Sequence, residues 1–201
     1  IRDTLPGSVI VGDSAQPIYA ANLYYDHDRP SGWFNAATGF GALGYAAPAS
    51  IGAQLAAPGT PVVCLTGDGG LQFSLAELGS AKDIDAPVIF VVWNNNGYQE
   101  IETSMVDAKI KPIGVTPQAP DFCLIAKAYA IASSRPASLA AFAKALVTAR
   151  KTNSTFLIDL DEGLVDHIAH LETRARGDPG VVSGGGQADL EAQGLQGSHD
   201  R

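Results

Sequence analysis

Four short apolar runs divide the chain, and each one closes in polar or glycine residues. Their length and their content of Val, Ile and Leu are typical of β-strands. One of them, PVIFVVW, is apolar throughout, as expected of a strand that is covered on both faces of a parallel sheet. We therefore predict strands within 8–14, 61–70, 87–97 and 155–162.

Helical patterns fill the stretches between these runs. Residues 38–59 begin with spaced glycines and then become rich in Ala, Leu and Ile. This change predicts a Gly-rich loop followed by a helix, with Pro48 tolerated near the first turn. Leu71, Leu75 and Leu78 recur at i, i+4 and i+7, so a further helix is predicted directly after the second run.

Two more helices are predicted at 121–131 and 136–151, and Asp121 is a candidate N-cap for the first of them. Strands and helices thus alternate along the sequence. This alternation predicts an α/β fold, in which an open, mainly parallel sheet carries helices on both faces in three layers.

The last part of the chain has a different character. Residues 166–201 carry no aromatic residue and include the stretch GDPGVVSGGGQ. They predict a Gly-rich, mobile tail after a single domain at 1–165. At its other end the chain begins Ile-Arg-Asp, and strand-like sequence follows almost at once, so we expect a piece of a longer protein.

Two of the predicted strands end in loops that combine glycine with a side-chain oxygen. Asp68 stands in LTGDGG, and Asn95 stands in NNNG, 27 residues further on. Asp-Gly and Asn-Gly are strong hairpin signals, yet neither loop is followed by a second alternating run. In an open α/β sheet the carboxyl ends of strands are where ligands bind. A ligand site therefore explains the two loops better than a turn does.

The residue types in these loops suit a metal and a phosphate group. The carboxylate of Asp68 and the amide oxygen of Asn95 are hard ligands, which Mg²⁺ prefers together with phosphate oxygens. The backbone amides of Gly69 and Gly70, at the start of the following helix, are suited to receive a diphosphate. If the two strands are neighbours in the sheet, the spacing predicts a magnesium–diphosphate site.

Composition narrows the class of partner. The 201 residues are 46% hydrophobic and 17% charged with a net charge of −8, so a nucleic-acid partner is not expected. No apolar run approaches the ~18 residues of a membrane helix. The two cysteines, Cys64 and Cys123, form neither a disulfide framework nor a metal-binding spacing. We therefore expect a globular, cytoplasmic protein without a membrane partner.

The sequence GDG, 24 intervening residues and NN resembles the magnesium–diphosphate motif of thiamine-diphosphate-dependent enzymes. With the flanking strands and the upstream Gly-rich loop, residues 1–162 resemble the C-terminal cofactor-binding domain of the acetolactate synthase and 2-oxo-acid decarboxylase superfamily. The resemblance implies thiamine diphosphate and Mg²⁺ as cofactors, with the metal bound by Asp68, Asn95 and the backbone carbonyl of Gly97. It assigns the diphosphate to the glycines around Asp68, which are Gly67, Gly69 and Gly70.

The stretch GFGALGYAAPASIGA resembles the segment that shapes the cofactor in this family. The resemblance implies that the carbonyl of Gly41 accepts a hydrogen bond from the aminopyrimidine and that Leu43 wedges the cofactor into a V. This V brings the amino group beside the thiazolium carbon and assists its deprotonation. Ser14 and Gln16, in GDSAQPIY, resemble a further contact to the diphosphate, and a plain turn at the strand end is the alternative.

The resemblance also implies a reaction, the decarboxylation of a 2-oxo acid with the cofactor as electron sink. In this family the glutamate that activates the cofactor lies on a separate N-terminal domain, usually of a neighbouring subunit. Nothing in the 201 residues resembles that pyrimidine-binding domain or the middle domain. The chain alone is therefore expected to be inactive, and to work with that domain in a homodimer or homotetramer.

The branch within the superfamily depends on the residues after Asn95. The stretches WFNAATGFGALGY, NNNGYQEI and APDF are most similar to the 5-guanidino-2-oxopentanoate decarboxylase branch. Acetolactate synthases continue into a GMVxQW-like stretch that this chain lacks, and an acetolactate synthase-like carboligase is the alternative. Pyruvate-type decarboxylases place a glutamate four residues after the metal-binding glycine, where this chain has Ile101. Glu100 and Glu102 flank it, as candidate proton relays or as a solvated helix start.

Two further classes stay open. A non-catalytic cofactor-binding module would share the same motifs. A nucleotide-binding α/β domain would share the alternation of strands and helices. The chain has neither a GxGxxG closing a first strand nor a GxxxxGKS/T loop, which weighs against that second class.

Overall fold

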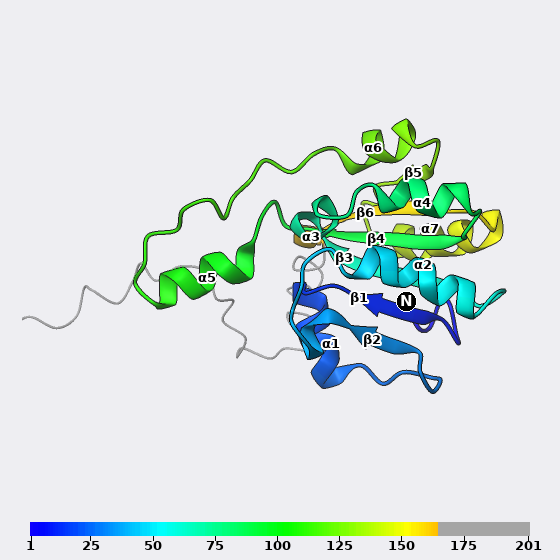
Figure 1. Ribbon diagram of the computed structural model, residues 1–201, viewed down its shortest axis with the longest axis horizontal. Coiled ribbons are helices and arrows are strands. Elements are labelled where there is room, and N and C mark those ends of the chain that lie inside the picture. Colours follow the sequence, from blue (N-terminus) through cyan, green and yellow to red (C-terminus); the bar gives the residue numbers. More distant parts are fainter. Residues whose placement is uncertain (165–201) are drawn as a thin grey trace, which may run out of the picture. The chain divides into compact units, whose positions relative to one another are not determined.

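The computed structural model describes residues 1–164, so the tail predicted at 166–201 lies outside the described residues. The centre of the fold is one sheet of six strands (Figure 1). The strands are β1 (Val9–Gly12), β2 (Trp33–Asn35), β3 (Val62–Gly67), β4 (Val88–Asn94), β5 (Ala132–Ser134) and β6 (Phe156–Asp161).

The pairings of this sheet are all parallel, and the strand order is β2-β1-β3-β4-β6-β5. The four predicted strands are confirmed as β1, β3, β4 and β6. The chain passes from β1 outward to β2 and then returns past β1 to β3. The carboxyl ends of β1 and β3 therefore flank a topological switch point, which is where open α/β sheets bind ligands.

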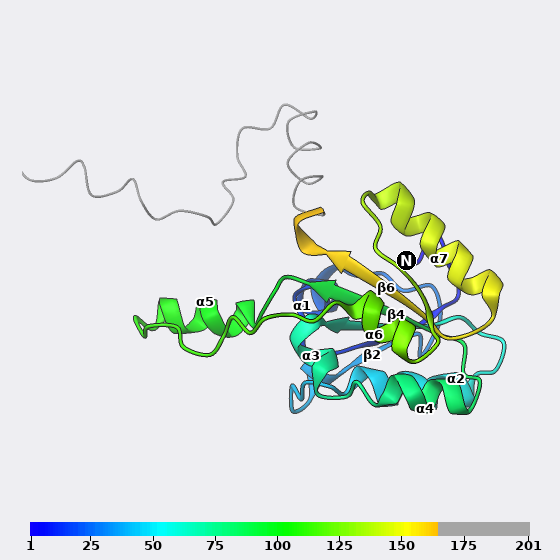
Figure 2. The same ribbon diagram turned by 90° about the horizontal axis from the view of Figure 1, so that it is seen from above.

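Helices cover both faces of the sheet, as Figure 2 shows from above. On one face, four helices pack on a buried cluster around Phe90; they are α2 (Ala46–Ala56), α3 (Asp68–Gln72), α4 (Glu77–Asp83) and α6 (Phe122–Ala128). On the other face, two helices pack on a cluster around Ile89; they are α1 (Gln16–Tyr24) and α7 (Leu139–Thr152). Neighbouring strand residues point to opposite faces, so the three-layer prediction is confirmed.

Local signals explain where several helices begin and end. Asp121 caps α6 as predicted, because its carboxylate accepts the Leu124 N–H at 3.0 Å. Ser138 caps α7 in the same way and accepts the Ala141 N–H at 3.1 Å. At the other end of α7, Asn153 adopts a left-handed conformation with φ 48°, which terminates the helix.

The prediction of a single helix after the GDG stretch was wrong, because the chain forms two helices there, α3 and α4. Leu71 and Leu78 are both fully buried, so the pattern identified the inward positions. Between them, the N–H groups of Phe73 and Ser74 donate to carbonyls three residues back instead of four. This tighter turn brings Phe73 against Gly44, where an added Cβ would lie 2.8 Å from the Phe73 Cβ.

Several short elements gave no usable pattern. Neither α1 nor β2 was predicted, and the helix predicted at 121–131 ends at Ala128 and is followed by β5. Edge strands of this length are paired on one side only, so they need no long alternating run. The nine-residue helix α5 (Gln99–Asp107) contributes no buried residue and projects away from the sheet in Figures 1 and 2.

The structure also describes the state of the two cysteines and the lengths of the helices. Cys64 and Cys123 are both free, and burial raises the pKa of the Cys64 thiol to about 12. Within residues 1–164, none of the helices combines the length and the apolar character needed to span a bilayer.

Phe90→Ala is expected to lower the free energy of unfolding by about 3–5 kcal/mol, because lost burial and the remaining cavity both count against the fold. Phe90 is fully buried, whereas Phe40 is fully exposed, so Phe40→Ala is the matched control and should change stability by less than about 0.5 kcal/mol. Urea denaturation followed by circular dichroism measures both variants. Equal losses would contradict the placement of Phe90 in the core.

Candidate functional site

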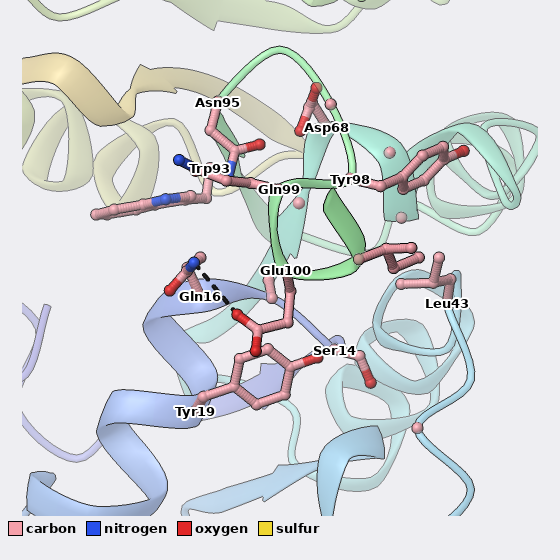
Figure 3. Close-up of a pocket in the computed structure, with 17 residues that line it drawn as sticks. Ser14, Gln16, Tyr19, Leu43, Asp68, Trp93, Asn95, Tyr98, Gln99 and Glu100 are labelled. Carbon is pink, nitrogen blue, oxygen red and sulfur yellow. Dashed lines mark hydrogen bonds between the residues drawn. The ribbon is translucent and has the colours of Figure 1, made fainter. Parts of the chain in front are cut away.

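A cavity of about 270 Å³ lies at the carboxyl ends of the strands (Figure 3). Its wall comes from the loops after β1 and β4, from the end of β3 and the start of α3, from the Gly-rich loop before α2 and from the start of α5. The predicted metal site requires that β3 and β4 are neighbours in the sheet, and these two strands pair directly. The cavity lining includes all ten residues singled out from the sequence, which are Ser14, Gln16, Gly41, Leu43, Gly67, Asp68, Gly69, Gly70, Asn95 and Gly97.

Asp68 brings a buried carboxylate to this cavity. The residue is 1% exposed, and its Oδ2 is a buried oxygen without a hydrogen-bond partner among residues 1–164. Burial raises the pKa of this carboxyl above its ordinary value, and the backbone amides of Gly69 and Asn95 offset part of the rise. An ionised oxygen without a donor is costly to bury, so the site favours a cation.

Two neutral oxygens converge on Asp68 from the loop after β4. In one of the two orientations of its amide, the side-chain oxygen of Asn95 lies 3.2 Å from Asp68 Oδ1 and 3.0 Å from the carbonyl oxygen of Gly97. Mg²⁺ binds oxygens at about 2.0–2.1 Å in an octahedron, which places neighbouring ligands about 2.9 Å apart. The observed spacing therefore matches adjacent ligands of one magnesium ion.

The amide of Asn95 can satisfy this site in two orientations. With its oxygen directed at Asp68 and Gly97, its NH₂ group donates to Gln99 Oε1 at 3.0 Å. With the amide turned over, the NH₂ group would instead donate to Asp68 and to the Gly97 carbonyl. The turned orientation suits a site without a cation, because it places donors among the oxygens. The first orientation suits a bound cation, so one loop can serve both states.

The oxygen set also limits the kind of metal. Among residues 1–164 there is no group of three or more His, Cys, Asp or Glu side chains that could hold a metal ion. The site at Asp68 offers one carboxylate and two neutral oxygens, and it offers no nitrogen or sulfur ligand. Hard cations such as Mg²⁺ select oxygen ligands of this kind, whereas zinc and copper favour imidazole and thiolate.

Close approaches of the backbone explain two of the glycines at the cavity. A Cβ added to Gly69 would collide with the ring of Tyr98. A Cβ added to Gly97 would lie 2.7 Å from the carbonyl oxygen of Val115. A larger residue at Gly69 would therefore require the Tyr98 ring to move, and one at Gly97 would displace the loop that carries the predicted metal ligands.

Sequence reasoning missed Asp13, which follows β1 directly. Its fully buried carboxylate accepts the Gly44 N–H at 2.8 Å, the Thr66 hydroxyl at 3.1 Å and the Ser14 N–H at 2.9 Å. Burial raises the pKa of Asp13, and these donors offset part of the rise. Asp13 therefore ties the Gly-rich loop to the ends of β1 and β3. A lone acid closing an apolar run, as at Asp68, is the signal that could have found it.

Ser14 and Gln16 lie on the side of the cavity formed by α1. Ser14 Oγ is a buried polar atom without a partner among the described residues, so it is available to a ligand. Gln16 reaches towards α5, where its Nε2 donates to Glu100 Oε2 at 3.4 Å (Figure 3). This contact connects two elements that are far apart in the sequence.

Of the two candidate proton relays, Glu100 lines the cavity and Glu102 does not. Apart from Glu100 and its neighbour Ile101, the other lining residues carried no signal that pointed to a cavity. Trp93 is the second-last residue of β4, and its indole N–H donates to Glu162 Oε1 at 2.9 Å. Its place directly before NNNG is the one feature that could have selected it. The remaining lining residues are Ala15, Tyr19, Tyr98, Gln99, Glu100 and Ile101.

A parallel sheet with an oxygen-lined cavity beside its switch point defines this chain as an α/β ligand-binding domain. Residues 13–160 match the family model described as "Thiamine pyrophosphate enzyme, C-terminal TPP binding domain". The chain therefore belongs to this family of thiamine pyrophosphate-binding domains, and the resemblance stated from its sequence is confirmed.

Three relatives show how far the similarity extends. The chain is 38% identical over 141 residues to the "Probable 2-ketoarginine decarboxylase" of Pseudomonas aeruginosa, covering 69% of this chain and 25% of that protein. It is 29% identical over 181 residues to the acetolactate synthase isozyme 3 large subunit of Escherichia coli, covering 88% and 31%. The solved thiamine diphosphate-dependent 4-hydroxybenzoylformate decarboxylase of Rhodococcus jostii superposes with a TM-score of 0.72 at 26% identity, covering 80% and 30%. The chain thus spans less than a third of each relative.

Asp68→Asn is expected to stabilise the metal-free fold at neutral pH. Because the pKa of Asp68 in the folded state lies above the ordinary 3.8, ionisation disfavours folding, and this loss grows as pH rises through the folded-state pKa. Asn cannot ionise, so the variant does not lose this stability. Its free energy of unfolding in EDTA should therefore exceed the wild-type value at about pH 7. The two values should converge below about pH 4. Urea titrations across pH measure this, and a pH-independent difference would contradict it.

Proposed function

We propose that this chain is the cofactor-binding part of a 2-oxo-acid decarboxylase that depends on thiamine diphosphate and magnesium. The observation that carries the proposal is the cluster of oxygens from Asp68, Asn95 and Gly97 inside a thiamine pyrophosphate-binding domain. Its spacing suits Mg²⁺, and Mg²⁺ is ordinarily bound in proteins together with phosphate oxygens of the ligand.

The proposed site divides the cofactor between metal ligands and backbone donors. Asp68, Asn95 and the Gly97 carbonyl would bind the metal. The N–H groups of Gly69 and Gly70 lie in the first turn of α3, where the helix itself leaves them without partners, so they would receive the diphosphate.

The other lining residues would hold the organic part of the cofactor and its surroundings. The carbonyl of Gly41 would accept a hydrogen bond from the aminopyrimidine, and Leu43 would support the bend between the rings. Ser14 and Gln16, with Gly67, would complete the diphosphate side. Bound thiamine diphosphate supplies the electron sink for loss of CO₂ from a 2-oxo acid.

We propose 5-guanidino-2-oxopentanoate, which is 2-ketoarginine, as the substrate. The relative with 38% identity is named for this compound. Among the described residues that line the cavity, Glu100 is the acid besides Asp68, and no Lys, Arg or His accompanies it. With Asp68 directed at the metal, Glu100 leaves a negative charge for a guanidinium group, which pairs well with carboxylates.

An acetolactate synthase-like carboligase is the second candidate function. Its support is the 29% identity to an acetolactate synthase large subunit over 88% of this chain. A carboligase would use the same metal and diphosphate groups, so the two candidates differ in what the cavity admits after CO₂ has left. A non-catalytic fragment would bind the cofactor without turnover.

The proposal extends to the assembly. Phe40, Phe73 and Ile101 are exposed large apolar side chains on or beside segments that line the cavity. Large apolar side chains exposed around a binding site are candidates for a contact surface. We propose that the N-terminal pyrimidine-binding domain of the same or a neighbouring subunit covers this face, in a cytoplasmic homodimer or homotetramer.

Asp68→Ala is expected to abolish magnesium-dependent binding of thiamine diphosphate in the full-length enzyme. The variant lacks the charged ligand, so Mg²⁺ affinity should fall by more than the roughly 10–100-fold that follows loss of an outer partner of a metal ligand. Calorimetric titration at fixed Mg²⁺ measures binding, and circular dichroism checks the fold. Asp83→Ala, at an exposed position on α4, is the control. Unchanged binding in Asp68→Ala would refute the metal assignment.

Glu100→Gln is expected to lower the preference of the full-length enzyme for the guanidino substrate. A hydrogen bond to a charged group is worth about 1.5–3 kcal/mol, so the ratio of kcat/KM for 5-guanidino-2-oxopentanoate to that for 2-oxopentanoate should fall about 10- to 100-fold. Steady-state assays with both compounds measure the ratio. Preference of the wild-type enzyme for pyruvate, with acetolactate as product, would favour the carboligase instead.

A further inference from the structure

A row of hydrogen-bonded side chains crosses three neighbouring strands beside the cavity. Asn94 ends β4, Asp159 lies in β6, and Arg135 follows β5 directly. The strands stand in the order β4-β6-β5, so the three residues succeed one another across the carboxyl-terminal edge of the sheet. None of the three residues is among those that line the cavity.

Asp159 is the centre of this row and is 1% exposed. Its Oδ2 accepts from Arg135 Nε at 2.9 Å and from Arg135 Nη2 at 2.7 Å. Its Oδ1 accepts from Asn94 Nδ2 at 3.1 Å. Arg135 Nη2 also donates to Asp121 Oδ1 at 3.1 Å, which anchors the outer end of the row. A buried carboxylate with this many donors holds its neighbours firmly, because losing one leaves charge unpaired.

Asp159 decides which way the Asn94 amide faces. An ionised carboxylate can only accept hydrogen bonds, so the NH₂ group of Asn94 must turn towards it. The Asn94 oxygen is thereby directed at the following loop, where it accepts the N–H of Asn96 at 3.2 Å. Hydrogen bonds of this kind, in which an Asn oxygen accepts from the backbone N–H two residues further on, stabilise tight turns.

Asn96 separates Asn95 and Gly97, the two loop residues proposed as metal ligands. Its N–H belongs to the peptide that joins it to Asn95, so the bond from Asn94 fixes that peptide. Its left-handed φ of 61° then sets the direction in which the chain continues to Gly97. Beyond Gly97, the Tyr98 N–H donates to the carbonyl oxygen of Val115 at 2.8 Å, and this bond holds the far end of the loop.

We propose that Arg135, Asp159 and Asn94 are positioning residues that keep the oxygens of Asn95 and Gly97 in metal-binding geometry. This inference rests on the proposed magnesium site. The row touches neither ligand oxygen and acts through the backbone hydrogen bond at Asn96. Partners that orient metal ligands from outside ordinarily change metal affinity about 10- to 100-fold.

Asp159→Asn in the full-length enzyme tests this role. The variant keeps the shape of the side chain, removes the charge that Arg135 binds and lets the Asn94 amide face either way. The Mg²⁺ concentration that half-saturates thiamine diphosphate binding should rise about 10- to 100-fold. Asp83→Asn removes the same charge at an exposed position and should leave that concentration unchanged. Arg135→Gln, at the half-exposed end of the row, should shift it in the same direction and replaces Asp159→Asn if that variant does not fold.

Amide hydrogen exchange in EDTA separates positioning from a general loss of stability. In Asp159→Asn, exchange at the Asn96 N–H should accelerate more than exchange at Phe90 in the core of β4. Equal acceleration at both amides, or an unchanged Mg²⁺ requirement in both row variants, would overturn the inference. A wild-type enzyme that binds the cofactor without Mg²⁺ would overturn the proposed function along with it. A wild-type enzyme that needs Mg²⁺, with variants that need no more, would overturn the inference alone.

Discussion

Two carboxylates buried at the ends of adjacent strands are the constraint on which the cavity depends. Taking an ionised carboxylate out of water costs several kcal/mol unless donors or a cation compensate it. Asp13, after β1, receives three hydrogen bonds from the chain itself. Asp68, after β3, keeps one buried oxygen without a partner among residues 1–164. The Asp13 carboxylate therefore links segments of the chain, whereas the Asp68 carboxylate keeps an oxygen that can bind a ligand.

Parallel pairing turns this local chemistry into one site. The register that sets Gly12 against Leu65, and Gly67 against Trp93, brings the ends of β1, β3 and β4 to the same edge of the sheet. The proposed metal ligands Asp68 and Asn95, 27 residues apart in sequence, thus meet without any long excursion of the chain. The same register continues to β6 and β5, so the support for the metal loop comes from the sheet itself.

The gathering of ten residues around one cavity could be predicted, because strand-end loops that approach a ligand need particular residue types. A glycine-rich stretch, or an acid that closes an apolar run, is visible in a short stretch of sequence. The same signal marks Asp13, but its role in joining segments could not be predicted, since its donors Gly44 and Thr66 lie 31 and 53 residues away. The strand β5 escaped for a related reason: its three residues owe their form to pairing with β6. Long-range pairing is information that a local pattern does not hold.

The helix proposed to meet the substrate stands apart from the rest of the fold in one respect. Because α5 contributes no buried residue, most substitutions in it would change the free energy of unfolding by less than about 0.5 kcal/mol. Natural proteins accumulate mutations until stability approaches a threshold, and changes that leave stability untouched escape this limit. Selection could therefore alter substrate preference through α5 repeatedly, without compensating mutations in the core. This capacity to change substrate preference follows from the position of α5 outside the buried core, and it does not depend on the present sequence of the helix.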